Sequence, residues 1–342
     1  MKKAVFFVVL AAVMVFVSCG AKPGNTQAGS PVSAEGSLKA APGETYYMIT
    51  FHSGSDFWKA IFMNFKRAAD LYGAEVKIMG TPADDASDLA RILEQVAATK
   101  PAGIALAAVN ADAMVEPINK IIEAGIPLVT FDSDSPNSKR LSYVAVGNYG
   151  AGRVAGEAIA QAIGGRGTIS GTIVPGAENL EERWRGVRTV IAEKYPNVKI
   201  INPVNERYDE VEAAKQISAL LAAHPEVNGL FGSLSSSGVG IGTALKEMGK
   251  TSRDIKVFAF DTDAGTLEML QDGTISGTLL QGREKMGYWS FQMLYSIVHK
   301  TIAGAENWQS INPLPPTIDA GVTIVPAERA ANYVEDWSNY KY

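Results

Sequence analysis

The chain has 342 residues, with 31 Lys and Arg against 36 Asp and Glu and a formal net charge of −5. Hydrophobic residues make up 46% of it, which excludes wholesale disorder, and the length favours two domains. No long basic block occurs, which argues against a nucleic-acid partner. One cysteine excludes a disulfide scaffold within the chain, and with only three histidines we expect no metal site.

The first residues have the layout of an export signal. Two lysines precede an apolar run at 4–17, which is shorter than the ~20 residues of a membrane-spanning helix. The Ser-Cys-Gly at 18–20 then resembles a bacterial lipobox, although Phe16 stands where that motif usually has leucine. The resemblance implies cleavage after residue 18 and a membrane anchor of acyl chains, palmitate among them, on Cys19. The alternative is an ordinary secretory signal that happens to contain a cysteine. Cleavage would leave 29 basic and 36 acidic residues, a charge of −7.

A segment rich in Gly, Ser, Ala and Pro follows, and we expect residues 19–44 to form a flexible tether. Beyond it, short apolar runs alternate with amphipathic stretches. In the first half we expect strands at 46–51, 75–79, 103–107 and 127–131, and helices at 57–72, 86–98 and 111–124. In the second half we expect strands at 167–174, 198–202, 229–231, 256–260 and 275–281, and helices at 148–163, 182–194, 210–224, 238–248, 262–271 and 286–302. This alternation predicts parallel sheets that are covered by helices on both faces.

The two halves also share a short sequence. Residues 129–134 read VTFDSD and residues 258–263 read FAFDTD, so each is an apolar strand that ends in Phe-Asp. Together with the matching order of strands and helices, this favours two similar α/β lobes.

Ligands of open α/β sheets bind beyond the carboxyl ends of the strands, and that rule selects the candidate residues. They are His52–Trp58, Asp84, Asn110 and Asp132 in the first half, and Glu178–Arg185, Tyr208, Ser233–Ser237, Asp261 and Gln281 in the second. The set combines acids, arginine, hydroxyls and aromatic rings. It suits a ligand with many hydroxyl groups and one apolar face.

Two other kinds of chemistry are weighed against this. The Gly-Val-Gly-Ile-Gly at 238–242 follows a strand, but its third glycine comes one position early for a dinucleotide fingerprint, and Thr243 takes its place. No G-x-S-x-G motif of a hydrolase is present in the sequence. Asp132 and Asp261 could form a glycosidase pair, but on separate lobes their spacing would change with closure. We therefore expect binding without catalytic residues and without a cofactor.

Several motifs of the body carry a family resemblance. They are Ser-Asp-Phe-Trp at 55–58, Glu-Arg-Trp-Arg-Gly at 182–186, Tyr-Asp at 208–209 and the Phe-Asp pairs that end at Asp132 and Asp261. From about residue 45 the chain resembles the type I periplasmic sugar-binding proteins of ABC transporters, in the ribose-binding form. The resemblance implies sugar contacts by Ser55, Phe57, Trp58, Asp132, Arg183, Tyr208, Ser233, Ser235, Asp261 and Gln281. The aromatic rings would stack on the sugar, and the aspartates would accept hydrogen bonds from its hydroxyls.

Three positions depart from the family pattern. Ser55 and Leu234 replace asparagines, and Ser133 replaces an arginine. A site built for those groups would leave ribose hydroxyls unpaired, at roughly 1–3 kcal/mol each. We therefore expect another pentose or hexose, such as xylose, glucose or galactose.

The resemblance also implies a fold and a role. The fold is two similar doubly wound parallel-sheet lobes joined by a hinge. The boundaries are a signal at 1–18, a tether at 19–44, a first lobe at 45–147 plus 282–317, and a second lobe at 148–281 plus 318–342. A monomer in the periplasm or at the cell surface, held by Cys19, would deliver its sugar to an ABC permease. The alternative is a lipoprotein that senses a sugar or an autoinducer-2-like signal for a membrane receptor or kinase.

Overall fold

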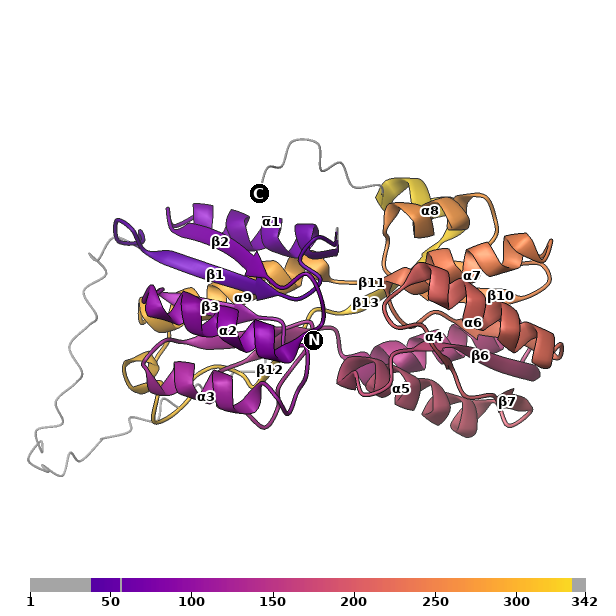
Figure 1. Cartoon of the computed structure of the whole chain (residues 1–342), viewed down its shortest axis with the longest axis horizontal. Coiled ribbons are helices and arrows are strands. Elements are labelled where there is room, and N and C mark those ends of the chain that lie inside the picture. The colour runs from indigo at the N-terminus through magenta and orange to yellow at the C-terminus, as the bar shows by residue number, and fades with distance from the viewer. Residues whose placement is uncertain (1–37, 56, 334–342) are drawn as a thin grey trace, which may run out of the picture. The chain divides into compact units, whose positions relative to one another are not determined.

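The computed structural model describes residues 38–55 and 57–333 (Figure 1). The predicted signal, Cys19 and most of the predicted tether lie outside the described residues. The end of the tether segment is described, and there the backbone N–H of Ala40 donates to the carbonyl of Tyr72 at 2.8 Å. No helix in the part of the chain that the structure describes is both long enough and apolar enough to cross a membrane.

The first sheet has the strand order β12-β5-β4-β3-β1-β2, and all of its pairs are parallel. Its strands are β1 (Thr45–Thr50), β2 (Glu75–Gly80), β3 (Gly103–Leu106), β4 (Leu128–Phe131), β5 (Tyr143–Ala145) and β12 (Thr317–Asp319). Its helices are α1 (Phe57–Asp70), α2 (Ala86–Ala98), α3 (Val115–Glu123) and α9 (Arg283–Val298), with the short η1 (Ala305–Asn307). Helix α1 packs against α9, and α2 packs against α3 (Figure 1).

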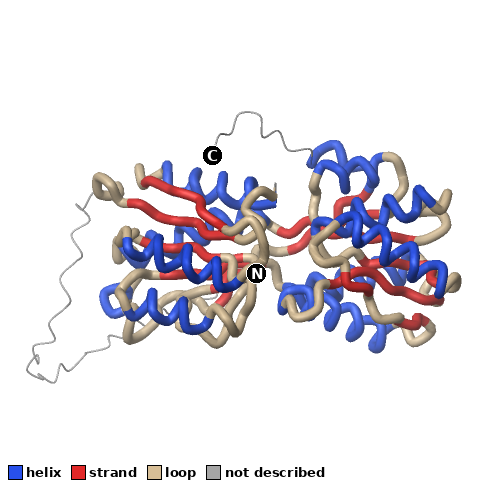
Figure 2. Tube along the Cα trace, viewed as in Figure 1, coloured by secondary structure: helices blue, strands red, loops and turns tan. Residues whose placement is uncertain are grey.

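The second sheet has the strand order β13-β11-β10-β9-β6-β7, and β8 pairs with β6 beside it. Its strands are β6 (Gly167–Ile173), β7 (Val198–Ile200), β8 (Val204–Asn205), β9 (Val227–Phe231), β10 (Lys256–Phe260), β11 (Gly277–Gln281) and β13 (Val322–Pro326), and only the pair β11–β13 is antiparallel. Its helices are α4 (Asn148–Ala162), α5 (Glu178–Lys194), α6 (Glu210–Ala223), α7 (Ser235–Glu247) and α8 (Ala264–Gln271), with η2 (Ala327–Tyr333). The colouring of Figure 2 shows the strands of each sheet between layers of helix.

Burial explains why these runs form central strands. Every residue of β3 and β4 is buried, as are five of the six residues of β1. Such strands contact helices on both faces, which is why they read as continuous apolar runs rather than as alternating ones. The predicted α/β class with two mainly parallel sheets is confirmed.

Several predicted boundaries and omissions need correction. Helix α3 begins at Val115 rather than at residue 111, because Asn110 first forms a turn in which its carbonyl and side chain accept from Met114 and Ala113. Helices α5, α7 and α9 begin three or four residues before their predicted starts, at Glu178, Ser235 and Arg283. Strands β5, β8, β12 and β13 were not predicted.

The chain passes between the two sets of elements at three places. Strand β5 leads into α4, which packs on β9 and β10; β11 leads into α9, which packs on β3 and β4; and β12 leads into β13. The second and third passages lie side by side, because the N–H of Gly282 donates to the carbonyl of Gly321 at 3.2 Å. Residues from both sheets therefore meet where the strands end.

Candidate ligand-binding site

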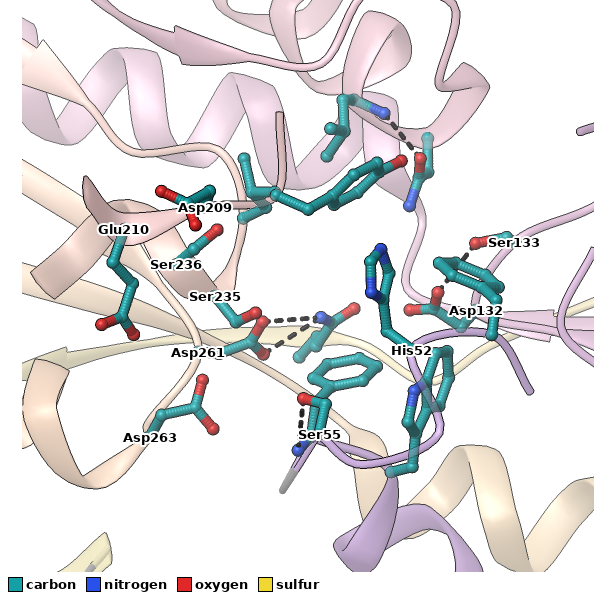
Figure 3. A pocket seen from close by; sticks show the side chains of 18 of the residues that line it. His52, Ser55, Asp132, Ser133, Asp209, Glu210, Ser235, Ser236, Asp261 and Asp263 are labelled. Atoms are coloured by element: carbon teal, nitrogen blue, oxygen red, sulfur yellow. Dashed lines mark hydrogen bonds between the residues drawn. The ribbon is translucent and has the colours of Figure 1, made fainter. Parts of the chain in front are cut away.

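A cavity of about 600 Å³ lies among residues that follow strands of both sheets (Figure 3). Its volume is in the range of small-molecule sites. Its lining is Phe51, His52, Ser55, Phe57, Trp58, Asp132, Ser133, Asn179, Leu180, Arg183, Tyr208, Asp209, Glu210, Val211, Leu234, Ser235, Ser236, Asp261, Asp263, Ala264, Gly265 and Gln281.

Two buried aspartates face each other across this cavity (Figure 3). Asp132 directly follows β4 and Asp261 directly follows β10, and both adopt left-handed backbone, with φ of 58° and 67°. Asp and Asn tolerate this conformation better than most residues. Burial raises the pKa of both carboxyl groups, that of Asp261 to about 7, although Arg183 opposes the rise in both. Each carboxylate is thus an acceptor that has lost most of its water.

A glutamine connects Asp261 to a buried arginine. The side-chain amide of Gln281 donates to the two Asp261 oxygens at 3.0 and 3.1 Å, and its carbonyl accepts from Arg183 Nη2 at 3.2 Å. Arg183 Nη1 also donates to the carbonyl of Ser233 at 2.6 Å, and its guanidinium carbon lies 3.7 Å from the ring centroid of Phe260. The guanidinium group is thereby held on several sides while it lines the cavity.

The same arginine is tied to the first aspartate. Arg183 Nε donates to Asn148 Oδ1 at 2.9 Å, and Asn148 Nδ2 donates to the hydroxyl of Tyr143 at 3.5 Å. Tyr143 in turn donates to the backbone carbonyl of Asp132 at 2.6 Å. A continuous series of hydrogen bonds therefore runs from Asp132 to Asp261, and it includes Asn148 and Gln281 at two of the three passages between the sheets.

Aromatic rings form the apolar part of the lining. Trp58 is only 3% exposed and meets the rings of Phe51, Phe57 and Phe131 edge-on, with centroids 4.8–5.8 Å apart. Tyr208 comes from the second set of elements, and its ring centroid lies 5.5 Å from that of His52. Rings from both halves can thus contact the C–H face of one ligand.

The serine hydroxyls are largely committed to protein partners. Ser133 donates to Asp132 at 2.9 Å, and Ser55 Oγ accepts from the N–H of Phe57 at 3.2 Å. Ser236 and the buried Ser237 both donate to Glu206, whose pKa burial raises to about 7. Where a hydroxyl already donates to the protein, its oxygen can only accept from a ligand.

Nine of the ten predicted ligand-binding residues line the cavity, namely Ser55, Phe57, Trp58, Asp132, Arg183, Tyr208, Ser235, Asp261 and Gln281. Ser233 is not in the lining. It is fully buried, and its hydroxyl donates to the carbonyl of Thr172 at 2.7 Å. Two broader candidates, Asp84 and Asn110, are not in the lining either. Asp84 lies 3.9 Å from His52 Nε2.

Several lining residues were not predicted. Phe51 ends the first strand region, while Asp209–Val211 and Asp263–Gly265 open α6 and α8. Asp209–Val211 and Asp263–Gly265 could have been found from the sequence, because they closely follow the predicted site residues Tyr208 and Asp261. Three further carboxylates, Asp209, Glu210 and Asp263, make the side of the cavity at the starts of α6 and α8 acidic (Figure 3).

The arrangement supports binding. Buried carboxylates accept hydrogen bonds, Arg183 donates them, and aromatic rings cover apolar C–H groups. Among residues 38–55 and 57–333, no group of three His, Cys, Asp or Glu side chains could hold a metal ion.

Comparison with known proteins also indicates a binding protein. A family model described as a periplasmic binding protein domain matches residues 46–301. A sugar-binding protein of a sugar ABC transporter from Bacillus halodurans is 34% identical, with a TM-score of 0.80 over 85% of this chain and all of that one. AraP, an arabinose binding protein from Geobacillus stearothermophilus, is 34% identical, with a TM-score of 0.77 over 86% of this chain and 100% of that one. The ribose import binding protein of Escherichia coli (strain K12) is 24% identical over 258 residues, 75% of this chain and 85% of that protein.

Proposed function

Because this chain belongs to the periplasmic binding protein family, we propose that it captures a monosaccharide in the cavity at the strand ends of its two sheets and delivers it to an ABC sugar permease. The observation that carries the proposal is the pair of buried aspartates that face each other across an aromatic-lined cavity. As a member of a family of transporter binding proteins the chain is not an enzyme, and its place is extracytoplasmic.

The sugar is a pentose or a hexose in this proposal. The relatives are named for binding sugar, arabinose and ribose, which supports the class. Ser55, Ser133 and Leu234 stand where the ribose-binding pattern has amides and an arginine, so the donors toward the ligand differ from those of that pattern. Xylose, arabinose, glucose and galactose are therefore better candidates than ribose.

Capture works by closure in this proposal. The lobes are 45–147 plus 282–317 and 148–281 plus 318–342, and a sugar that contacts both favours the closed form. Support comes from the three passages of the chain between the two sets of elements. Because all of β12 (Thr317–Asp319) pairs with β5 in the first sheet and β13 belongs to the second, the third passage follows Asp319, two residues later than the proposed boundary.

Membrane anchoring completes the proposal. Lipid on Cys19 holds a monomer at the membrane, and the part of the predicted tether before Leu38 gives it reach toward the permease, since Leu38 and Ala40 are already hydrogen-bonded to the folded body. Cys19→Ser is expected to release the protein into the soluble fraction, whereas the unaltered chain partitions with membranes. A Cys19→Ser chain that still partitioned with membranes after signal cleavage would contradict lipid anchoring.

Isothermal titration of residues 20–342 tests the central claim. A panel of D-xylose, L-arabinose, D-ribose, D-glucose and D-galactose is expected to contain a ligand with a roughly micromolar or lower Kd, about −8 kcal/mol. Asp132→Asn and Asp261→Asn keep the side-chain shape and suit the left-handed backbone, so neither variant should unfold the chain. Each removes a carboxylate that accepts hydrogen bonds from the sugar, so each should abolish binding. Absence of heat with every sugar, polyol and nucleoside tried would exclude the function, and normal binding by both variants would exclude the site.

A further inference from the structure

Arg283 is a buried arginine directly behind the cavity wall. It is the first residue of α9, follows Gln281 by two positions and is 1% exposed, yet it does not belong to the cavity lining. The chain is fixed at this point, because Gly282 donates to Gly321 and Lys285 Nζ donates to the carbonyl of Ala320 at 2.9 Å. The guanidinium group therefore lies where the second and third passages of the chain between the sheets run side by side.

The contacts of Arg283 reach both halves of the site. Nη1 donates to Asp263 Oδ1 at 3.3 Å, and Nη2 donates to Thr262 Oγ1 at 3.0 Å. The guanidinium carbon also lies 5.6 Å from the ring centroid of Phe57, within cation–π range. Phe57 is the first residue of α1, which packs with the first sheet. Asp263 is the N-cap of α8, which packs with the second sheet.

A buried, charged arginine at the start of a helix destabilises the fold unless nearby groups compensate its charge. The N-terminus of a helix carries a partial positive charge, which disfavours a cation in the first turn. Burial disfavours the charge further, unless carboxylates compensate it. Among the described residues, Asp263, which it contacts, and Asp261, two residues earlier in the same loop, compensate part of this charge.

We propose that Arg283 is a positioning residue of the binding site, whose buried positive charge beside Thr262 and Asp263 favours the anionic, hydrogen-bond-accepting form of Asp261. The role in ligand binding rests on the proposed function. The effect of Arg283 on Asp261 does not, because it is measured in the ligand-free protein.

The electrostatic surroundings of Asp261 agree with this role. Burial raises the pKa of its carboxyl group, and Arg283 is the strongest influence in the opposite direction, ahead of Arg183. The charged groups that act on it are Arg283 on α9, Arg183 on α5 and Asp263 at the start of α8, while the neutral Gln281 donates to it from β11. Asp132 lies across the cavity (Figure 3). Without Arg283, the remaining carboxylates and the burial would favour the protonated form.

Carboxyl NMR of the ligand-free protein tests the inference. Asp261 is assigned from the signal that Asp261→Asn removes, and its pKa is measured by titration. Arg283→Gln is expected to raise the pKa of Asp261 by about 1 to 3 pH units, because an opposite charge at close range lowers a carboxyl pKa by that amount. Arg283→Lys keeps the charge and should stay close to the wild-type value. An unchanged pKa in a folded Arg283→Gln variant would overturn the proposal.

A matched control separates this effect from the loss of any arginine. Arg153 pairs with Glu193 on the helices α4 and α5, and Arg153→Gln is expected to leave the pKa of Asp261 unchanged. If Arg283→Gln does not fold, Thr262→Val removes the hydroxyl that accepts from Nη2 and lets the guanidinium group shift. The pKa of Asp261 should then rise, and an unchanged value would equally overturn the proposal.

Sugar binding gives the second measurement, with whichever sugar of the panel binds the wild type most tightly. The pH below which affinity falls should move upward in Arg283→Gln by the same amount as the pKa, whereas Arg283→Lys should restore the wild-type profile. An affinity loss that is equal at every pH would indicate a merely structural role and overturn the proposal. If no sugar binds the wild type, the proposed function fails, and the NMR titration still decides the role of Arg283.

Discussion

Two buried carboxyl groups at the site are poised to titrate in the neutral range. Burial raises the pKa of Asp261 and that of Glu206 to about 7, against 3.8 and 4.5 for the free groups. Asp261 lines the cavity, whereas Glu206 lies behind it and accepts from the hydroxyls of Ser236 and Ser237. Because the folded state holds these protons more tightly than the unfolded state, both groups link stability to pH.

The first prediction follows from the sign of that linkage. A raised folded-state pKa gives a stability contribution that is complete below about pH 4 and is lost as the pH rises through about 7. Between about pH 4 and pH 7, each of the two groups should therefore lower the free energy of unfolding of the ligand-free protein by roughly 1 kcal/mol for every unit that the pH rises. Urea unfolding across the window measures it. Asp261→Asn should remove one contribution and Glu206→Gln the other, and unchanged slopes in both variants would contradict the assignment.

A second prediction concerns Asn148, which joins the first aspartate to the ligand arginine. Asn148→Ala leaves the buried Arg183 Nε without its acceptor, which costs about 1–3 kcal/mol. Sugar affinity should weaken by roughly 5- to 150-fold, because the guanidinium group is no longer held toward the cavity. Titration calorimetry measures the loss. Asn64→Ala removes an amide that bonds within its own helix, to Ala60 and Arg67, and it should leave affinity unchanged.

Individual residues also show where sequence reasoning is limited. Asp132, Asp261 and Gln281 could be predicted because each lies at the carboxyl end of an apolar strand. Ser233 fulfils the same rule but turns its hydroxyl into the protein, and only the local backbone decides that direction. Arg283 could not be singled out from the sequence, because the predicted helix begins at residue 286, and only the structure places Arg283 in the first turn of α9.

At the scale of elements, the contact of α4 with α5 positions Arg183. Gly152 and Gly186 let these helices approach so closely that a Cβ on Gly152 would lie 1.8 Å from the carbonyl oxygen of Arg183. A Cβ on Gly186 would lie 2.1 Å from the carbonyl oxygen of Tyr149. The distance between two helix backbones thus sets the depth of the ligand arginine.

The third prediction uses this contact. Gly152→Ala should force α4 and α5 apart, lower the free energy of unfolding by about 1–3 kcal/mol and weaken sugar binding. Gly150 lies on the same helix, and a Cβ added there would have no atom within 4 Å, so Gly150→Ala should raise stability by about 0.5–1 kcal/mol. Urea unfolding and calorimetry distinguish the two. Equal effects of the two substitutions would show that the close helix contact is unimportant.

Three of the four strands that sequence reasoning missed are very short, while the fourth, β13, is a five-residue strand that pairs antiparallel at the edge of the second sheet. Strands β5, β8 and β12 have three, two and three residues, too few for a hydrophobic period to register. They become strands only because a neighbouring strand supplies their hydrogen bonds. Helices of eight or more residues were placed correctly, with errors of a few residues at their ends. The N-caps of α3, α5 and α9 are Met114, Ala177 and Gly282, which make no side-chain cap hydrogen bond, so these starts lack the usual capping signal in the sequence.

At the scale of the whole molecule, the cavity is strongly acidic. Among the described residues, its lining contains five carboxylates but only one arginine. Asp209 is partly engaged as the N-cap of α6, and Arg283 compensates Asp263 from behind. The wall at Glu210 and Asp263 nevertheless remains negative, and the proximity of Asp263 raises the pKa of Glu210 in addition to the effect of burial.

The fourth prediction is exclusion of acidic sugars. D-Glucuronate and D-galacturonate should bind at least about 100-fold more weakly than D-glucose and D-galactose, since like charges brought together cost several kcal/mol. Competition against the tightest sugar of the panel measures the difference. Glu210→Gln should narrow the gap, whereas the exposed Glu116→Gln, on α3, should not. Uronates that bind as well as their neutral parents would contradict an acidic cavity.

The left-handed backbone at Asp132 and Asp261 limits how this protein can change its ligand during evolution. At both positions aspartate, asparagine and glycine adopt the observed φ with little strain, whereas β-branched residues are strongly disfavoured there. New sugar specificities are therefore expected to arise at flanking positions such as Ser55, Ser133 and Ser235, with the two aspartates inherited unchanged. A selection experiment for growth on a new pentose would accumulate its substitutions around these two residues and not at them.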